Sequence, residues 1–208
     1  MTIKATSLLS ILVIWACMIP AVAIEPGAWW ALIFAFLATG SIGIGAWRRL
    51  GLSRLIGVAG IWAGTAAAVA SDPGNAWTSI FAFLSTGAVV YSIMRRDALV
   101  TGLGIGATWA MVGAVLAAHG SDGSWIVVFA FLTTGSLANS RSRAAKGLAT
   151  MLWWGIAGTI MLATGTWYWL CVPAFLLSAA SLGLTDLRLP RGLEWDLFER
   201  DDEPRMVN

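Results

Sequence analysis

Charged residues are scarce in this chain. Asp, Glu, Lys and Arg make up 12% of its 208 residues, about half of the roughly 25% that is usual for a soluble domain. A helix needs about 20 apolar residues to cross a hydrocarbon core ~30 Å thick. The uncharged stretches are 5–24, 26–47, 55–71, 73–94, 98–121, 123–140 and 147–185. The last is long enough to fold back near Gly165, so the sequence predicts eight transmembrane helices.

Asp, Glu, Lys and Arg are absent from the interior of these predicted spans. Proton relays, coupled transporters and voltage sensors ordinarily need such residues, and no nucleophile and base pair can be drawn from the remainder. The chain has one His and two Cys, without the spacing of a metal site. Its basic residues are dispersed, which argues against a nucleic-acid partner. We therefore expect no catalytic residues, no metal and no cofactor.

A tandem repeat organises the chain. The run WTSIFAFLSTG at 77–87 recurs with changes at 30–40, at 125–135 and, more weakly, at 169–179. A tryptophan precedes each copy, and these are Trp15, Trp62, Trp109 and Trp153. The pattern predicts an all-α polytopic membrane protein built of four tandem two-helix hairpins of about 47 residues. The repeats are 5–50, 51–97, 98–146 and 147–185, which together form a transmembrane domain at 1–185; a tail follows at 186–208.

The basic residues predict the orientation. All 13 Lys and Arg fall on one side of the eight-helix arrangement, and such residues in short loops are retained in the cytoplasm. Both termini are therefore expected to be cytoplasmic, in a multi-pass protein of the cytoplasmic membrane. Each repeat has two crossings, so the repeats are parallel and not inverted, unlike those of many secondary transporters.

Each upstream tryptophan lies about ten residues into its predicted helix, near the middle of the bilayer, where its indole N–H needs a partner. Three Thr-Gly pairs lie at a similar depth in the following helices: Thr39-Gly40, Thr86-Gly87 and Thr134-Gly135. The favoured interpretation is a knob in a socket, in which the indole fills the space over Gly and donates to Thr. The alternative is a central cavity lined by the tryptophans, for an apolar or cationic ligand.

Glycines recur at four-residue spacing in two predicted helices, at Gly60 and Gly64 and at Gly102 and Gly106. Small residues so spaced allow close backbone approach between membrane helices. They predict a helix–helix contact.

Three acids occupy the outer turns, namely Glu25, Asp72 and Asp122. They are interpreted as solvated turn residues. If the repeats closed into a ring, the same carboxylates would surround its outer mouth and attract cations.

The tail carries four apolar residues in an otherwise charged run: Leu193, Trp195, Leu197 and Phe198. A segment of this composition is typically disordered when free, so these residues suggest docking to a membrane or cytoplasmic protein partner. Together with the lipid bilayer, that is the only partner predicted. The expected function is that of a non-enzymatic structural or accessory subunit or scaffold; the alternative is an uncoupled transporter or channel for a small, largely uncharged solute.

Overall fold

The computed structural model describes residues 5–45, 51–92, 98–139 and 144–180, and this part of the chain contains helices and no strand. The described residues form eight α-helices and four short 3₁₀ helices, and one 3₁₀ helix follows each odd-numbered α-helix. The α-helices are α1 (Ala5–Ile24), α2 (Ala31–Gly45), α3 (Leu52–Ser71), α4 (Thr78–Tyr91), α5 (Ala98–His119), α6 (Ile126–Asn139), α7 (Ala144–Thr164) and α8 (Cys171–Ala180). The 3₁₀ helices are η1 (Pro26–Ala28), η2 (Pro73–Trp77), η3 (Gly120–Gly123) and η4 (Tyr168–Leu170).

The odd-numbered helices are the long ones. Among the described residues, four stretches are long and apolar enough to cross a membrane: Ala5–Ile24, Leu52–Ser71, Leu99–Gly123 and Lys146–Thr164. The even-numbered helices have 10 to 15 described residues each, because a 3₁₀ helix takes up the start of the return path. The structure thus has eight helices, as expected, of which four have the length of a membrane span.

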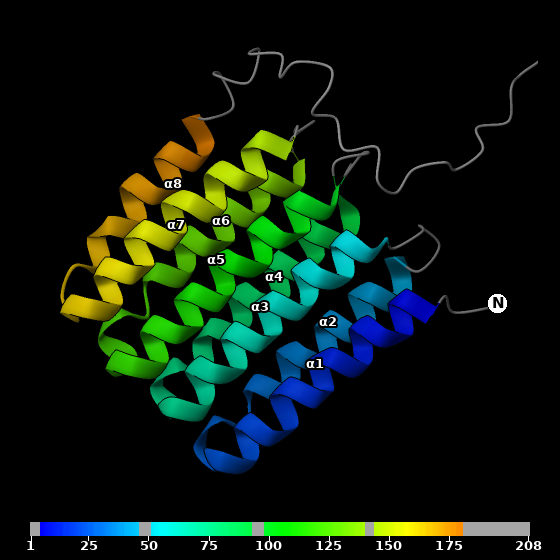
Figure 1. Cartoon of the computed structure of the whole chain (residues 1–208). Helices are drawn as coiled ribbons and strands as arrows, with labels where there is room; N and C mark the ends of the chain where they lie inside the picture. Colours follow the sequence, from blue (N-terminus) through cyan, green and yellow to red (C-terminus); the bar gives the residue numbers. More distant parts are fainter. Residues whose placement is uncertain (1–4, 46–50, 93–97, 140–143, 181–208) are drawn as a thin grey trace, which may run out of the picture.

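The helices form two layers (Figure 1). Helix α3 packs between α1 and α5, and α5 packs against α7, while α2, α4, α6 and α8 pack in the same sequence in a second layer. Each even-numbered helix also packs back on the odd-numbered helix before it. The result is a row of four hairpins with α1 and α2 at one end and α7 and α8 at the other (Figure 1).

Glycine allows the closest contact in the row, between α3 and α5. A methyl group added at Gly60 would collide with the backbone of Gly106, and one added at Gly64 would collide with the carbonyl group of Trp109. Gly102 fits against the backbone of Ser53 in the same way. The two glycine patterns therefore belong to one interface, where the backbones touch because no side chain separates them.

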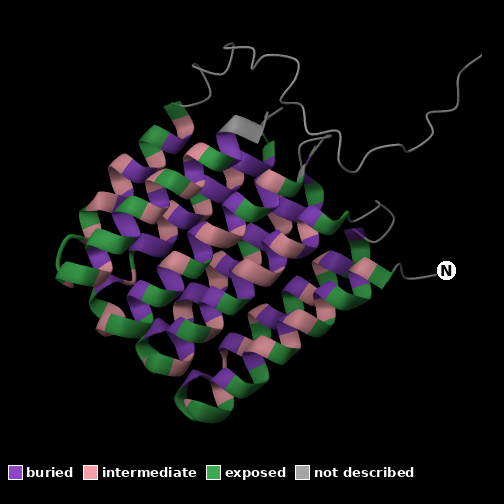
Figure 2. Ribbon diagram, viewed as in Figure 1, coloured by how far each residue is buried: buried purple, intermediate pink, exposed green. Residues whose placement is uncertain are grey.

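The outer edge of α1 carries large side chains instead. Three glycines of α5 lie on the side that faces α3. Relative to Trp109, Gly102 is seven residues earlier, Gly106 is three residues earlier and Gly113 is four residues later. The same positions around Trp15 are Leu8, Leu12 and Ile19, which are 50%, 55% and 56% exposed. In Figure 2 the buried residues are correspondingly concentrated in the middle of the row. The first hairpin thus ends the row with a bulky apolar edge.

A reversal of the chain follows α7. Gly165 adopts a left-handed φ of 65°, and its N–H donates to the carbonyl oxygen of Met161 at 2.9 Å. Glycine is favoured at such a helix end because a side chain would be strained there. The chain folds back at the position that the sequence predicts.

Candidate functional site

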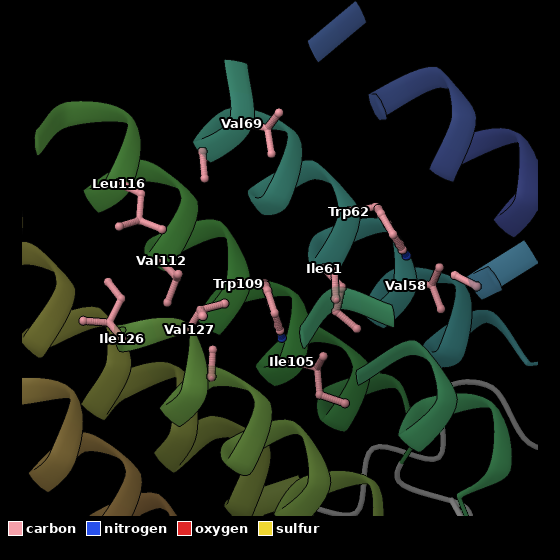
Figure 3. Packing of buried hydrophobic residues seen from close by; sticks show 14 of the residues in the cluster. Val58, Ile61, Trp62, Val69, Ile105, Trp109, Val112, Leu116, Ile126 and Val127 are labelled. Atoms are coloured by element: carbon pink, nitrogen blue, oxygen red, sulfur yellow. The ribbon is translucent and has the colours of Figure 1, made fainter. Parts of the chain in front are cut away.

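Tryptophan and threonine meet between the two layers in the first three hairpins. In each, the indole Nε1–H of the odd-numbered helix donates to the hydroxyl oxygen of the threonine in the next helix. The pairs are Trp15–Thr39 at 3.1 Å, Trp62–Thr86 at 2.9 Å and Trp109–Thr134 at 2.9 Å. Figure 3 shows Trp62 and Trp109 on α3 and α5 among the buried side chains of the core.

Each threonine hydroxyl also has a partner for its own proton. The Oγ1–H groups of Thr39, Thr86 and Thr134 donate to the alanine carbonyl oxygen one turn earlier, at 3.0, 2.8 and 2.8 Å. The threonine therefore accepts one hydrogen bond and donates another, so that no proton of the pair is left unbonded in an apolar environment. Thr86 and Thr134 also have no exposed surface.

The fourth hairpin differs from the prediction. Trp154, with 0% exposure, is the buried tryptophan of α7, whereas Trp153 is only half-buried. The indole of Trp154 donates to Thr133 of α6 at 3.2 Å. It therefore crosses to the preceding hairpin, and the assignment of Trp153 to the core set is corrected to Trp154. Trp154 is 24 residues before Ser178, and Trp15 is likewise 24 residues before Thr39.

The sockets over glycine are not present. A methyl group added at Gly40, Gly87 or Gly135 would meet no atom within 4 Å. Consecutive residues of a helix point about 100° apart, since 3.6 residues make one turn. The threonine that faces the tryptophan thus turns its neighbouring glycine away from it. The hydrogen bond to threonine exists, but the indole does not fill a glycine notch.

A ring with a central cavity does not form either. The hairpins lie in a row whose first and last members are at opposite ends (Figure 1), and the tryptophans are spread along that row. Trp15, in the hairpin at one end of the described row, is half-buried, whereas Trp62 and Trp109, whose hairpins have a neighbour on both sides, are 0% and 1% exposed. The acids Glu25, Asp72 and Asp122 accordingly do not surround a common opening.

A phenylalanine ladder connects the helices of the second layer, and it was not anticipated from the sequence. The first Phe of each FAF run contacts the second Phe of the next copy. The ring centroids of Phe34–Phe83, Phe81–Phe131 and Phe129–Phe175 are 6.3, 5.8 and 6.0 Å apart. At the ends of the ladder, Phe36 is 66% exposed and Pro173 replaces the first Phe of the last copy. The recurring FAF was the signal that could have revealed it.

Asp72 connects the turns of two neighbouring hairpins. Its Oδ1 accepts the N–H of Gly74 at 2.8 Å and its Oδ2 accepts the N–H of Ser121, in the next hairpin, at 3.0 Å. These bonds, that to Gly74 first, lower the pKa of the Asp72 carboxyl group. Asp122 is exposed and Glu25 is half-buried. Only Asp72 therefore departs from the prediction of three merely solvated acids.

Lys146 and Arg54 bond to helix ends on the opposite side of the molecule. Lys146 is 1% exposed, and its Nζ donates to the carbonyl oxygen of Ser136 near the end of α6 at 3.0 Å. Arg54 donates to the carbonyl oxygen of Ser92 after α4 at 2.8 Å. Cations suit these positions because the last carbonyl groups of a helix lack partners and carry partial negative charge.

The proposed docking residues of the tail, Leu193, Trp195, Leu197 and Phe198, lie outside the described residues. Comparison of the chain with protein-family models, with curated proteins and with solved structures finds no match. The geometry of the described residues is that of a two-layer helical row whose layers are joined by tryptophan–threonine hydrogen bonds.

Proposed function

We propose that this chain is an integral protein of the cytoplasmic membrane, in which four tandem hairpins cross the bilayer eight times and serve as a scaffold or accessory subunit without enzymatic activity. Large apolar side chains on its outer faces support the membrane location, among them Phe36, Ile44 and Leu152 at 66%, 70% and 58% exposure. A soluble protein rarely exposes such a surface. The shorter return helices require local thinning of the bilayer or tilted neighbours, at modest cost.

The observation that supports the scaffold role is that the interior threonines are buried and fully hydrogen-bonded. Thr86 and Thr134 have no exposed surface, and both hydrogen-bonding functions of each hydroxyl are used within the protein. A solute pathway along these threonines would need water at those hydroxyl groups. A shallow, open depression of about 420 Å³ on the surface of α7 around Gly155 is not lined by these threonines. A scaffold is therefore favoured over a channel or transporter for a small solute.

Cysteine labelling tests the membrane topology. In a background with Cys17 and Cys171 replaced by Ala, we expect Gly27→Cys and Asp122→Cys to react with a membrane-impermeant thiol reagent added to intact cells. Gly51→Cys should react only after the cells are opened. All three positions are exposed, and the added Cβ has room at both glycines. If Gly51→Cys is the only variant labelled in intact cells, the orientation is the opposite of the one proposed.

Removal of 193–208 tests the accessory role. We expect the helices to remain folded and a membrane or cytoplasmic protein partner to be lost, because the tail carries four apolar residues in an otherwise charged run. A matched variant that replaces only Leu193, Trp195, Leu197 and Phe198 with Ser keeps the length and charge. Affinity purification from native membranes, followed by mass spectrometry, should show the same loss for both variants. Identical partners for all three proteins would contradict the docking role.

A further inference from the structure

Two successive residues with hydroxyl groups occupy the same place in the runs of α4 and α6. In the aligned runs, Ser85-Thr86 of α4 corresponds to Thr133-Thr134 of α6, whereas α2 has Ala38 before Thr39. In α6 both hydroxyl groups accept an indole: Thr134 from Trp109 in its own hairpin, and Thr133 from Trp154 in the following one. An even-numbered helix can therefore serve two tryptophans.

In α4 the second hydroxyl group is unused. Thr86 accepts from Trp62, but Ser85 is 0% exposed and its Oγ has no hydrogen-bond partner. A buried hydroxyl group without a partner is uncommon and costly, especially in an apolar interior. Its position in the aligned run is that of Thr133, and Ser and Thr carry the hydroxyl oxygen on the same carbon atom. Ser85 thus presents the same acceptor that Trp154 uses.

Helices α5 and α7 have the same register on the odd-numbered helix before them, so Trp109 occupies the position that corresponds to Trp154. Gly147, seven residues before Trp154, fits against the backbone of Val100, which is nine residues before Trp109. Gly102, seven residues before Trp109, fits against Ser53, which is nine residues before Trp62. Helix α5 therefore sits on α3 in the register in which α7 sits on α5.

We propose that Trp109 is a two-position donor, bonded to Thr134 in the described structure and able to transfer its indole N–H to Ser85 when its side chain turns toward the second hairpin. Trp154 already makes the corresponding bond to the preceding hairpin. After the transfer, Thr134 keeps its own proton on the carbonyl oxygen of Ala130, and the Ser85 oxygen gains a partner. The transfer thus leaves no additional N–H or O–H unbonded, which makes it feasible in an apolar interior.

Trp62 provides the internal control, because the residue corresponding to Ser85 in the preceding hairpin is Ala38. Thr86→Val and Thr134→Val remove the same two hydrogen bonds from equivalent sites. We expect Thr134→Val to lower the thermal midpoint in detergent by clearly less than Thr86→Val, since only Trp109 has a second acceptor. Adding Ser85→Ala should abolish that difference, and Ala38→Ser should reduce the loss caused by Thr86→Val.

The indole N–H resonance of Trp109, assigned by its loss in Trp109→Phe, reports the bond directly. It should keep a hydrogen-bonded chemical shift in Thr134→Val and lose it when Ser85→Ala is added. Equal losses of stability in the two valine variants, unaffected by Ser85→Ala, would overturn the proposal. If neither valine variant folds, the 5-fluorotryptophan spectrum of the otherwise unaltered chain decides. A second Trp109 signal that Ser85→Ala removes supports the two positions, and a single signal in both proteins refutes them.

Discussion

Gly64→Ala is expected to destabilise the protein by about 1 to 3 kcal/mol, the range for overpacking a tight contact. The added methyl group would lie 2.7 Å from the carbonyl carbon of Trp109 and closer still to its oxygen. Backbone atoms cannot rotate away as the end of a side chain can. Helices α3 and α5 must therefore separate, and the loss extends to the apolar contacts along both.

Gly87→Ala is the matched control, because it adds the same methyl group to a helix where no atom lies within 4 Å. Its effect should be close to zero or slightly stabilising, since alanine restricts the unfolded chain more than glycine does. Thermal unfolding in detergent, followed by far-ultraviolet circular dichroism, compares the two. Equal midpoints for both variants would show that the α3–α5 contact is looser than described.

Trp62→Ala is expected to cost about 3 to 5 kcal/mol, the usual range for emptying a buried aromatic site. The side chain has 0% exposure and belongs to the buried hydrophobic cluster that also contains Val58 and Ile61 (Figure 3). Most of this loss should come from packing. A single side-chain hydrogen bond between membrane helices contributes only about 0.6 kcal/mol on average.

Two further variants separate these contributions. Thr86→Val removes the acceptor of the Trp62 indole but keeps the volume, so it should cost far less than Trp62→Ala. Trp153→Ala removes the same side chain from a half-buried position and should also cost less. Equilibrium unfolding of the three proteins in one detergent provides the measurement. A loss from Thr86→Val as large as that from Trp62→Ala would mean that the hydrogen bond, and not the packing, dominates.

Local features of the sequence predicted the helical class, the turns and the partners of three tryptophans. Apolar runs between Pro- and Gly-containing turns determine where helices begin and end, as at Gly165. A hydrogen bond between two helices joined by a short turn follows from depth alone, which is why Trp62 could be matched with Thr86. Glycines at four-residue spacing likewise indicated a close contact without indicating which helices make it.

The order of the hairpins in space was decided by tertiary structure. In a chain this apolar, hydropathy does not distinguish a face that packs against protein from one that does not, so a row and a ring were equally compatible with the repeats. The same ambiguity concealed that Gly87 faces open space and that Trp154 and not Trp153 is buried. Both facts depend on which way a residue points around its helix, and that direction is fixed only when the neighbouring helices have packed. Lys146 is buried for a related reason: its long stem reaches a helix end that comes within range only after α6 and α7 have packed.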